Sequence, residues 1–155
     1  MTYEDAIYYK LLLCVGINND FDVWLNTQVE QENPISKLVL DLFDCGENLN
    51  DKICVLNKYI LAANTEQIDK QKVFSLVVNK FKNLYEKNPE QLKHITEQMY
   101  SVAVESGWNE DEPWYTMYRL DDYYHLAAEG IIKKEDFMNC FSLLIYQQKA
   151  SNINY

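Results

Sequence analysis

The sequence contains few of the residues that form tight turns or interrupt helices. Among its 155 residues there are only four glycines and three prolines. A β-sandwich or barrel needs many turns rich in these residues, so their scarcity argues against an all-β fold. Hydrophobic residues make up 48% of the chain and aromatic residues 14%, which excludes disorder caused by low hydrophobicity. The composition therefore predicts a globular, all-α protein.

The residue patterns of common metal and catalytic sites are also missing. The four cysteines form no C-x-x-C pair and only two histidines are present, so the sequence predicts no zinc site. It contains no glycine-rich phosphate loop, no G-x-S-x-G elbow and no H-E-x-x-H motif. We therefore expect no catalytic residues, no metal ligands and no cofactor, and predict that the protein is not an enzyme.

The cysteines and apolar segments indicate a cytoplasmic location. Cys14, Cys54 and Cys140 each lie in an apolar helical run, which predicts buried, reduced thiols. Cys45 lies at a predicted helix end, where acidic neighbours are expected to raise its pKa. No apolar segment approaches the roughly 18 to 20 residues of a membrane span. The acidic residues before Cys14 do not fit an export signal, so we expect no membrane partner.

Charge is distributed unevenly along the chain. The net charge is −10, from 14 Lys plus Arg against 24 Asp plus Glu. Residues 1–50 carry a net charge of −7, residues 51–105 carry +1 and residues 106–155 carry −4. Such a chain would repel a nucleic acid backbone and attract a basic protein partner. The alternative is that outward helix faces are acidic only for solubility.

The few glycines and prolines lie between segments with helical apolar periodicity. Pro34, Pro89 and Pro113 are expected in first helical turns, and all four glycines are expected as left-handed C-terminal caps. This pattern predicts a compact, single-domain bundle of seven to eight helices over residues 1–149, followed by a flexible tail over 150–155. The predicted helices cover residues 3–15, 21–31, 34–45, 50–63, 66–87, 89–106, 112–129 and 134–149.

The segment from Trp108 to His125 is the densest in aromatic and acidic residues. At 100° per residue, four of its side chains form a stripe between the core face and the solvent face of one helix, namely Trp114, Tyr118, Asp121 and His125. Tyrosine, tryptophan and carboxylates suit contact with a Lys- or Arg-rich partner. The alternative is an internal network in which Asp121 orients His125.

Acidic residues next to this stripe extend the candidate surface. The run Glu110–Glu112 can contact a basic partner or stabilise the helix N-terminus through the helix dipole. Asp122 and His125 have the spacing of helical di-iron ligands, but Gln91 stands where His94 would need an acidic partner. The predicted partner-binding residues are Glu110, Asp111, Glu112, Trp114, Tyr118, Asp121, Asp122 and His125.

A second acidic patch is possible in the first fifty residues. There, carboxylates surround Trp24 on a short amphipathic helix, although a tryptophan in this position more often packs into the core. The carboxylates are Asp20, Asp22, Glu30 and Glu32, with Asp41, Asp44 and Glu47 as a weaker extension.

The overall character of the chain resembles a known class of proteins. Its Asn- and Lys-rich composition with a single arginine, its acidic excess and its segment Trp114–His125 resemble the small, acidic, all-helical immunity proteins that neutralise contact-dependent or polymorphic bacterial toxins. The resemblance implies stoichiometric binding to a toxin domain, often over a basic nuclease active site. The alternatives are a helical adaptor or regulatory subunit with an exposed apolar groove, and, more remotely, an enzyme that uses Asp121, Asp122 and His125.

Overall fold

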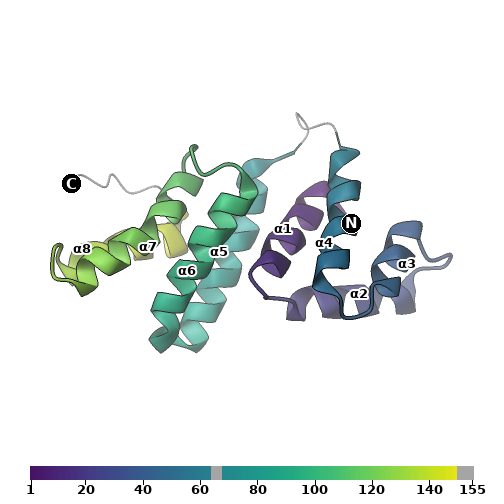
Figure 1. The fold of residues 1–155 in the computed structure, drawn as a ribbon, viewed down its shortest axis with the longest axis horizontal. Helices are drawn as coiled ribbons and strands as arrows, with labels where there is room; N and C mark the ends of the chain where they lie inside the picture. The colour runs from purple at the N-terminus through teal and green to yellow at the C-terminus, as the bar shows by residue number, and fades with distance from the viewer. Residues whose placement is uncertain (64–67, 150–155) are drawn as a thin grey trace. The chain divides into compact units, whose positions relative to one another are not determined.

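The computed structural model describes residues 1–63 and 68–149 and is all-helical over these residues. Within them no helix is both long and apolar enough to cross a membrane. Eight α-helices and one short 3-10 helix are described, in the order shown in Figure 1. They are α1 (Tyr3–Cys14), α2 (Asn19–Gln31), α3 (Lys37–Asp44), α4 (Leu49–Leu61), α5 (Lys70–Lys87), η2 (Pro89–Gln91), α6 (Leu92–Ser106), α7 (Trp114–Ala128) and α8 (Lys134–Gln147).

The all-α prediction is confirmed, and the predicted helix ends differ from the observed ends by at most four residues. The prediction that α3 starts at Pro34 is wrong, because the Ser36 side chain accepts a hydrogen bond from Val39 N and so begins the helix at Lys37. The prediction for the glycines is confirmed, since all four have a positive φ. Gly107, with φ 70°, caps the C-terminus of α6.

Contacts between residues divide the chain into two compact units, residues 1–73 and 74–155. The boundary falls within α5, which begins at Lys70. The single domain over residues 1–149 stays a prediction, and the expected tail over 150–155 lies outside the described residues.

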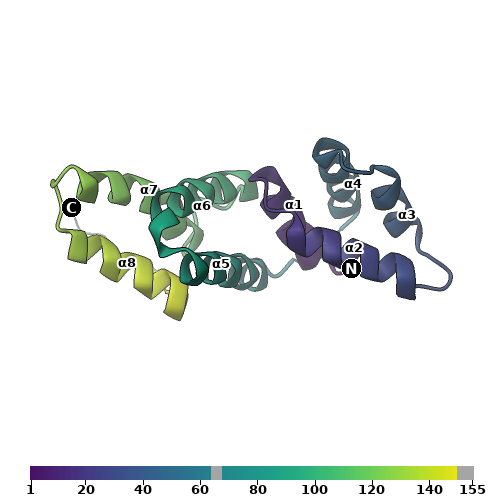
Figure 2. The same cartoon turned by 90° about the horizontal axis from the view of Figure 1, so that it is seen from below.

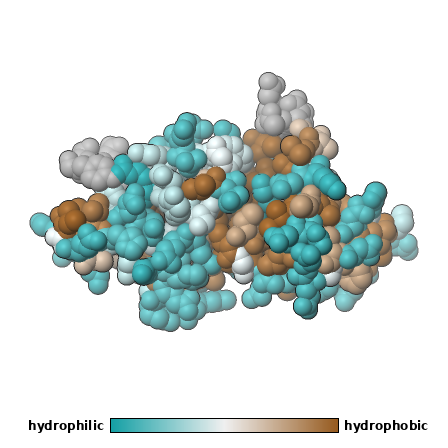
Figure 3. Space-filling view, viewed as in Figure 1, coloured by the Kyte–Doolittle hydropathy of each residue, from teal (hydrophilic) through white to brown (hydrophobic). Residues whose placement is uncertain are grey.

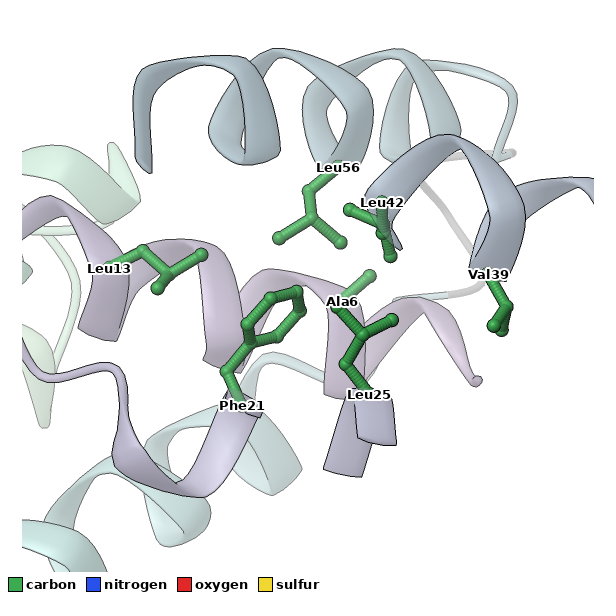
Figure 4. Packing of buried hydrophobic residues seen from close by; sticks show 7 residues of the cluster. All are labelled: Ala6, Leu13, Phe21, Leu25, Val39, Leu42 and Leu56. Atoms are coloured by element: carbon green, nitrogen blue, oxygen red, sulfur yellow. The ribbon is translucent and has the colours of Figure 1, made fainter. Parts of the chain in front are cut away.

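The N-terminal unit packs α1 against α4, and α3 against both α2 and α4. Figure 4 shows side chains from all four helices pointing into a shared apolar core. The residues of this core are Ala6, Leu13, Phe21, Leu25, Val39, Leu42 and Leu56. Burial of these side chains is the main favourable contribution to the folding of this unit.

Aromatic pairs join helices of the C-terminal unit. In Figure 2, α6 and α7 form one layer and α5 and α8 form the other. Three pairs of rings from different helices meet edge to face, with centroids 4.9–5.6 Å apart. Aromatic side chains prefer this geometry. The pairs are Phe74–Trp114, Tyr85–Phe141 and Tyr124–Phe137.

The prediction that three cysteines are buried is wrong. Cys54 is exposed, and Cys14 and Cys140 are partly exposed. In α4 the buried residues are Lys52 and Leu56, and Cys54, two positions from each, lies about 200° away on the helix surface. The pKa of Cys45 is raised, as predicted, although burial contributes more than any single nearby carboxylate does.

Candidate functional site

Three tyrosines from two helices form an exposed stack on the C-terminal unit. The rings of Tyr100 on α6 and Tyr118 on α7 are stacked with centroids 5.0 Å apart and planes at 28°. Tyr115 continues the stack, with its centroid 6.5 Å from that of Tyr118. Tyr100 is 38% exposed and Tyr115 is 39% exposed. We call Tyr100, Tyr115 and Tyr118 the tyrosine stack.

Neighbouring side chains hold the tyrosine stack in place. Arg119 Nη1 donates a hydrogen bond of 3.0 Å to the Tyr115 hydroxyl, and the guanidinium carbon lies 5.5 Å from the centre of the Tyr115 ring. This contact follows from the spacing of four residues on one helix. Tyr100 raises the pKa of Tyr118 more than any other neighbour, and the Asp122 carboxylate adds a smaller effect in the same direction.

Asp121 connects α7 to α6. Its Oδ1 lies 3.2 Å from the Thr96 hydroxyl oxygen, and Thr96 is completely buried. The same oxygen lies 3.8 Å from His125 Nε2, but the His125 side chain is 48% exposed whereas that of Asp121 is 20% exposed. The Thr96 hydroxyl also lies 2.8 Å from the Lys93 carbonyl oxygen, so its one proton is shared between this oxygen and Asp121, while His125 extends to the solvent.

The three acidic residues before α7, Glu110, Asp111 and Glu112, differ in their surroundings. Glu112 Oε2 accepts hydrogen bonds from Thr116 N at 3.2 Å and from the Thr116 hydroxyl at 2.8 Å. It thereby satisfies a backbone N–H in the first turn of α7 and a buried hydroxyl. The side chains of Glu110 and Asp111 are exposed. Glu112 thus supports the helix start, and the other two carboxylates are accessible to a partner.

The prediction that Trp114 belongs to the contact surface disagrees with its burial. Trp114 is only 2% exposed and packs edge to face against Phe74 and Trp108, with centroids 5.2 and 5.3 Å away. Its position is about 60° from that of buried Met117 on the helix surface, so α5 can cover it. Its indole nitrogen has no hydrogen-bond acceptor among the described residues. Trp114 is a core residue and leaves the candidate surface.

Tyr100 is the residue of the candidate surface that sequence reasoning missed. The predicted helix over 89–106 has a polar outward side with His94, Glu97 and Ser101, and a tyrosine on such a side is a signal of contact area. The sequence could not show that its ring stacks on Tyr118, because this pair depends on how α6 packs against α7. In Figure 3 the surface over α6 is mostly hydrophilic or intermediate in hydropathy.

Only some residues of the second predicted patch, the carboxylates around Trp24, remain available to bind a partner. The Trp24 ring packs with the rings of Tyr9 and Phe21, at 5.7 and 5.8 Å between centroids, so it belongs to the edge of the core. Asp41 is paired with Lys37 at 2.6 Å. Asp22 pairs with Lys52 at 3.0 Å beside a pocket that also includes Glu47.

Over the part of the chain that the structure describes, no three His, Cys, Asp or Glu side chains are grouped so that they could hold a metal ion. Comparisons with family models, with curated proteins and with solved structures find nothing that matches this chain. The function must therefore be inferred from the geometry of its own residues.

Proposed function

We propose that this protein is a non-enzymatic inhibitor of the immunity-protein kind, which neutralises a basic, nuclease-type bacterial toxin domain by stoichiometric binding. The observation that carries the proposal is the tyrosine stack, in which Tyr100 and Tyr115 are exposed and Tyr118 is partly exposed beside the Asp122 carboxylate. Stacked tyrosines offer rigid contact area at low entropic cost. The binding residues are Tyr100, Tyr115, Tyr118, Asp121, Asp122 and His125, with Glu110 and Asp111 at the start of α7.

The charge of the surface supports a basic partner. Asp122 is exposed on α7 and Asp121 is partly exposed. Arg119, the only arginine of the sequence, donates a hydrogen bond to the Tyr115 hydroxyl. With a net charge of −10 for the whole chain, long-range attraction would accelerate encounter with a basic domain and would weaken as salt is added. The tyrosines would then slow dissociation.

The test uses the toxin domain encoded by a neighbouring reading frame. We expect a 1:1 complex, protection of cells that express the toxin, and faster association at about 50 mM than at about 500 mM salt. The double variant Asp121→Lys/Asp122→Lys should weaken binding by at least about a hundredfold. Its control, Glu90→Lys/Glu105→Lys, makes the same charge change at two exposed positions of η2 and α6 and should change binding far less. Salt-insensitive binding that the first variant leaves unchanged would contradict the proposal.

A helical adaptor is the second candidate, because apolar side chains are exposed on the N-terminal unit. Leu40 and Phe43 lie three residues apart on α3 and are 45% and 50% exposed, and Figure 3 shows hydrophobic residues gathered over α1 and α4. In this case Phe43→Ser should abolish partner binding. The Asp121→Lys/Asp122→Lys variant should then bind as the wild type does.

A further inference from the structure

A pocket of about 760 Å³ opens in the N-terminal unit, between α2, the loop after α3 and the start of α4. Its apolar wall consists of Leu25, Phe43 and Leu49. Its polar groups come from Asn18, Asp22, Asn26, Glu47 and Lys52. Pockets that combine an apolar wall with a few polar groups are the usual form of a ligand site.

The lysine of this pocket is buried, whereas its carboxylates are accessible. The Lys52 side chain is 6% exposed, and its ammonium lies 3.0 Å from Asp22 Oδ1 and 5.3 Å from the centre of the Phe21 ring. By contrast, the Asp22 side chain is 37% exposed, and Glu47 is exposed. A ligand that enters the pocket therefore reaches the carboxylates more easily than the ammonium group of Lys52.

The asparagine at the start of α2 adds an acceptor. Asn18 occupies the N-cap position, but its side chain does not cap the helix. Its Nδ2 instead donates a hydrogen bond of 2.8 Å to Asp22 Oδ2. Within residues 1–63 and 68–149, neither the Asn18 amide oxygen nor the Glu47 carboxylate has a hydrogen-bond partner. The Asn18 amide oxygen and the Glu47 carboxylate can therefore accept hydrogen bonds from a ligand in this pocket.

We propose that the pocket binds a guanidinium or alkylammonium cation carried on an apolar stem. A guanidinium group can donate paired hydrogen bonds to a carboxylate such as that of Glu47. Both oxygens of Asp22 already accept hydrogen bonds, from Lys52 and Asn18, so Asp22 would contribute mainly its charge. The stem would contact Leu25 and Leu49, and the exposed ring of Phe43 would attract the cation through its face. The pKa of Cys45, which precedes Gly46 in the pocket wall, is raised mainly by burial. Asp51, Asp41 and Asp44 raise it further against the opposing effect of Lys52, so these carboxylates add negative potential near the pocket.

The proposal is tested on the full chain with agmatine, which carries a guanidinium and an ammonium group on a short alkyl chain. Titration followed by amide NMR and calorimetry should give saturable 1:1 binding, with the largest shifts in residues 18–26 and 43–52. Acetate is the matched anionic probe and should not bind. Binding of acetate in place of agmatine, or no binding of agmatine, would overturn the proposal.

Three variants separate this site from general attraction to an acidic protein. Glu47→Gln should weaken agmatine binding about tenfold, because it removes a charge-assisted hydrogen bond. Lys52→Met should strengthen it, because Asp22 loses its competing cation. Glu30→Gln makes the same charge change as Glu47→Gln at an exposed position of α2 outside the pocket and should have little effect. Equal losses for Glu47→Gln and Glu30→Gln, or weaker binding by Lys52→Met, would refute the site.

A second probe distinguishes the source of the cation. A Gly-Arg-Gly peptide with blocked ends presents the guanidinium as a protein side chain does, whereas agmatine represents a free metabolite. Tighter binding of the peptide would support an arginine of a protein partner, and tighter binding of agmatine would support a free amine. The site does not depend on the proposed inhibitor function, because both probes act without a toxin.

Discussion

At the scale of single residues, the tyrosine stack couples two phenols. Tyr100 is the largest cause of the raised pKa of Tyr118, first through electrostatic repulsion and second through a side-chain hydrogen bond between the two phenols. Tyr100→Phe keeps the ring but removes the hydroxyl, so we expect the pKa of Tyr118 to fall. NMR titration of tyrosines labelled at Cζ measures this value directly. Tyr85→Phe, far along α5, is the control, and an unchanged Tyr118 pKa in Tyr100→Phe would mean that the stack is not formed in solution.

Trp114 and Tyr115 are neighbours in sequence but differ in their surroundings. Trp114 is 2% exposed and Tyr115 is 39% exposed. Trp114→Ala should lower the free energy of unfolding by about 3–5 kcal/mol, because it opens a large cavity. Tyr115→Ala should lower it by about 1 kcal/mol or less, since it loses only the contacts of a surface ring. Urea unfolding measures both, and similar losses would contradict the assignment of Trp114 to the core.

At the scale of helices, the sequence predicted where elements lie but not all of their ends. Gly107 and the other glycines predicted helix C-termini because few residues other than glycine adopt a positive φ. Prolines were less informative, since Ser36 rather than Asn33 caps α3. A hydrogen bond from a nearby serine competes with the preference of proline for the first turn, and the sequence alone does not rank the two.

The start of α7 offers a direct test of a helix end. Glu112→Ala removes the acceptor of the Thr116 backbone N–H and of the buried Thr116 hydroxyl. We expect the free energy of unfolding to fall by about 1–3 kcal/mol. Glu110→Ala removes an equal charge from an exposed side chain and should cost much less. Adding Thr116→Val should recover part of the loss in Glu112→Ala, and the absence of recovery would argue against this hydrogen bond.

Contacts between helices explain what sequence reasoning missed at the candidate site. The spacing of Tyr115, Tyr118 and Asp121 within one helix could be predicted from 3.6 residues per turn. The roles of Tyr100 and Thr96 could not, because they depend on the packing of α6 against α7. For the same reason Trp114 was predicted at a boundary that α5 in fact covers.

At the scale of the whole molecule, part of the acidic charge is found at two defined sites. The first fifty residues hold part of the excess in a pocket where Asp22 is paired with Lys52 and Glu47 is exposed. The last fifty residues hold part of it beside the tyrosine stack. These two acidic sites lie in different compact units. The two sites share no residue, so we expect a Glu47 variant to change binding of agmatine and an Asp122 variant to change binding of a basic protein partner, each without altering the other, as calorimetry on the double variant would measure.

Several tyrosines make the stability of the protein sensitive to alkaline pH. Burial raises the pKa of Tyr8 above its ordinary value of 10.0, and the Asp20 carboxylate, 3.4 Å from its hydroxyl, adds to this effect. The phenols of Tyr9, Tyr59 and Tyr123 are shifted in the same direction by burial. Above about pH 10 the unfolded chain releases protons that the folded chain retains, so the free energy of unfolding falls as pH rises.

Tyr8→Phe should reduce this alkaline loss of stability. Between about pH 6 and pH 8 the variant should be less stable than the wild type by a constant amount, about 0.5–1.5 kcal/mol, because it lacks the hydrogen bond to Asp20. Above about pH 10 the difference should shrink, because the variant has one fewer phenol that ionises more easily when unfolded. Urea unfolding across this range measures the difference. A difference that stays constant up to about pH 11 would show that the Tyr8 phenol ionises equally in the folded and unfolded chains.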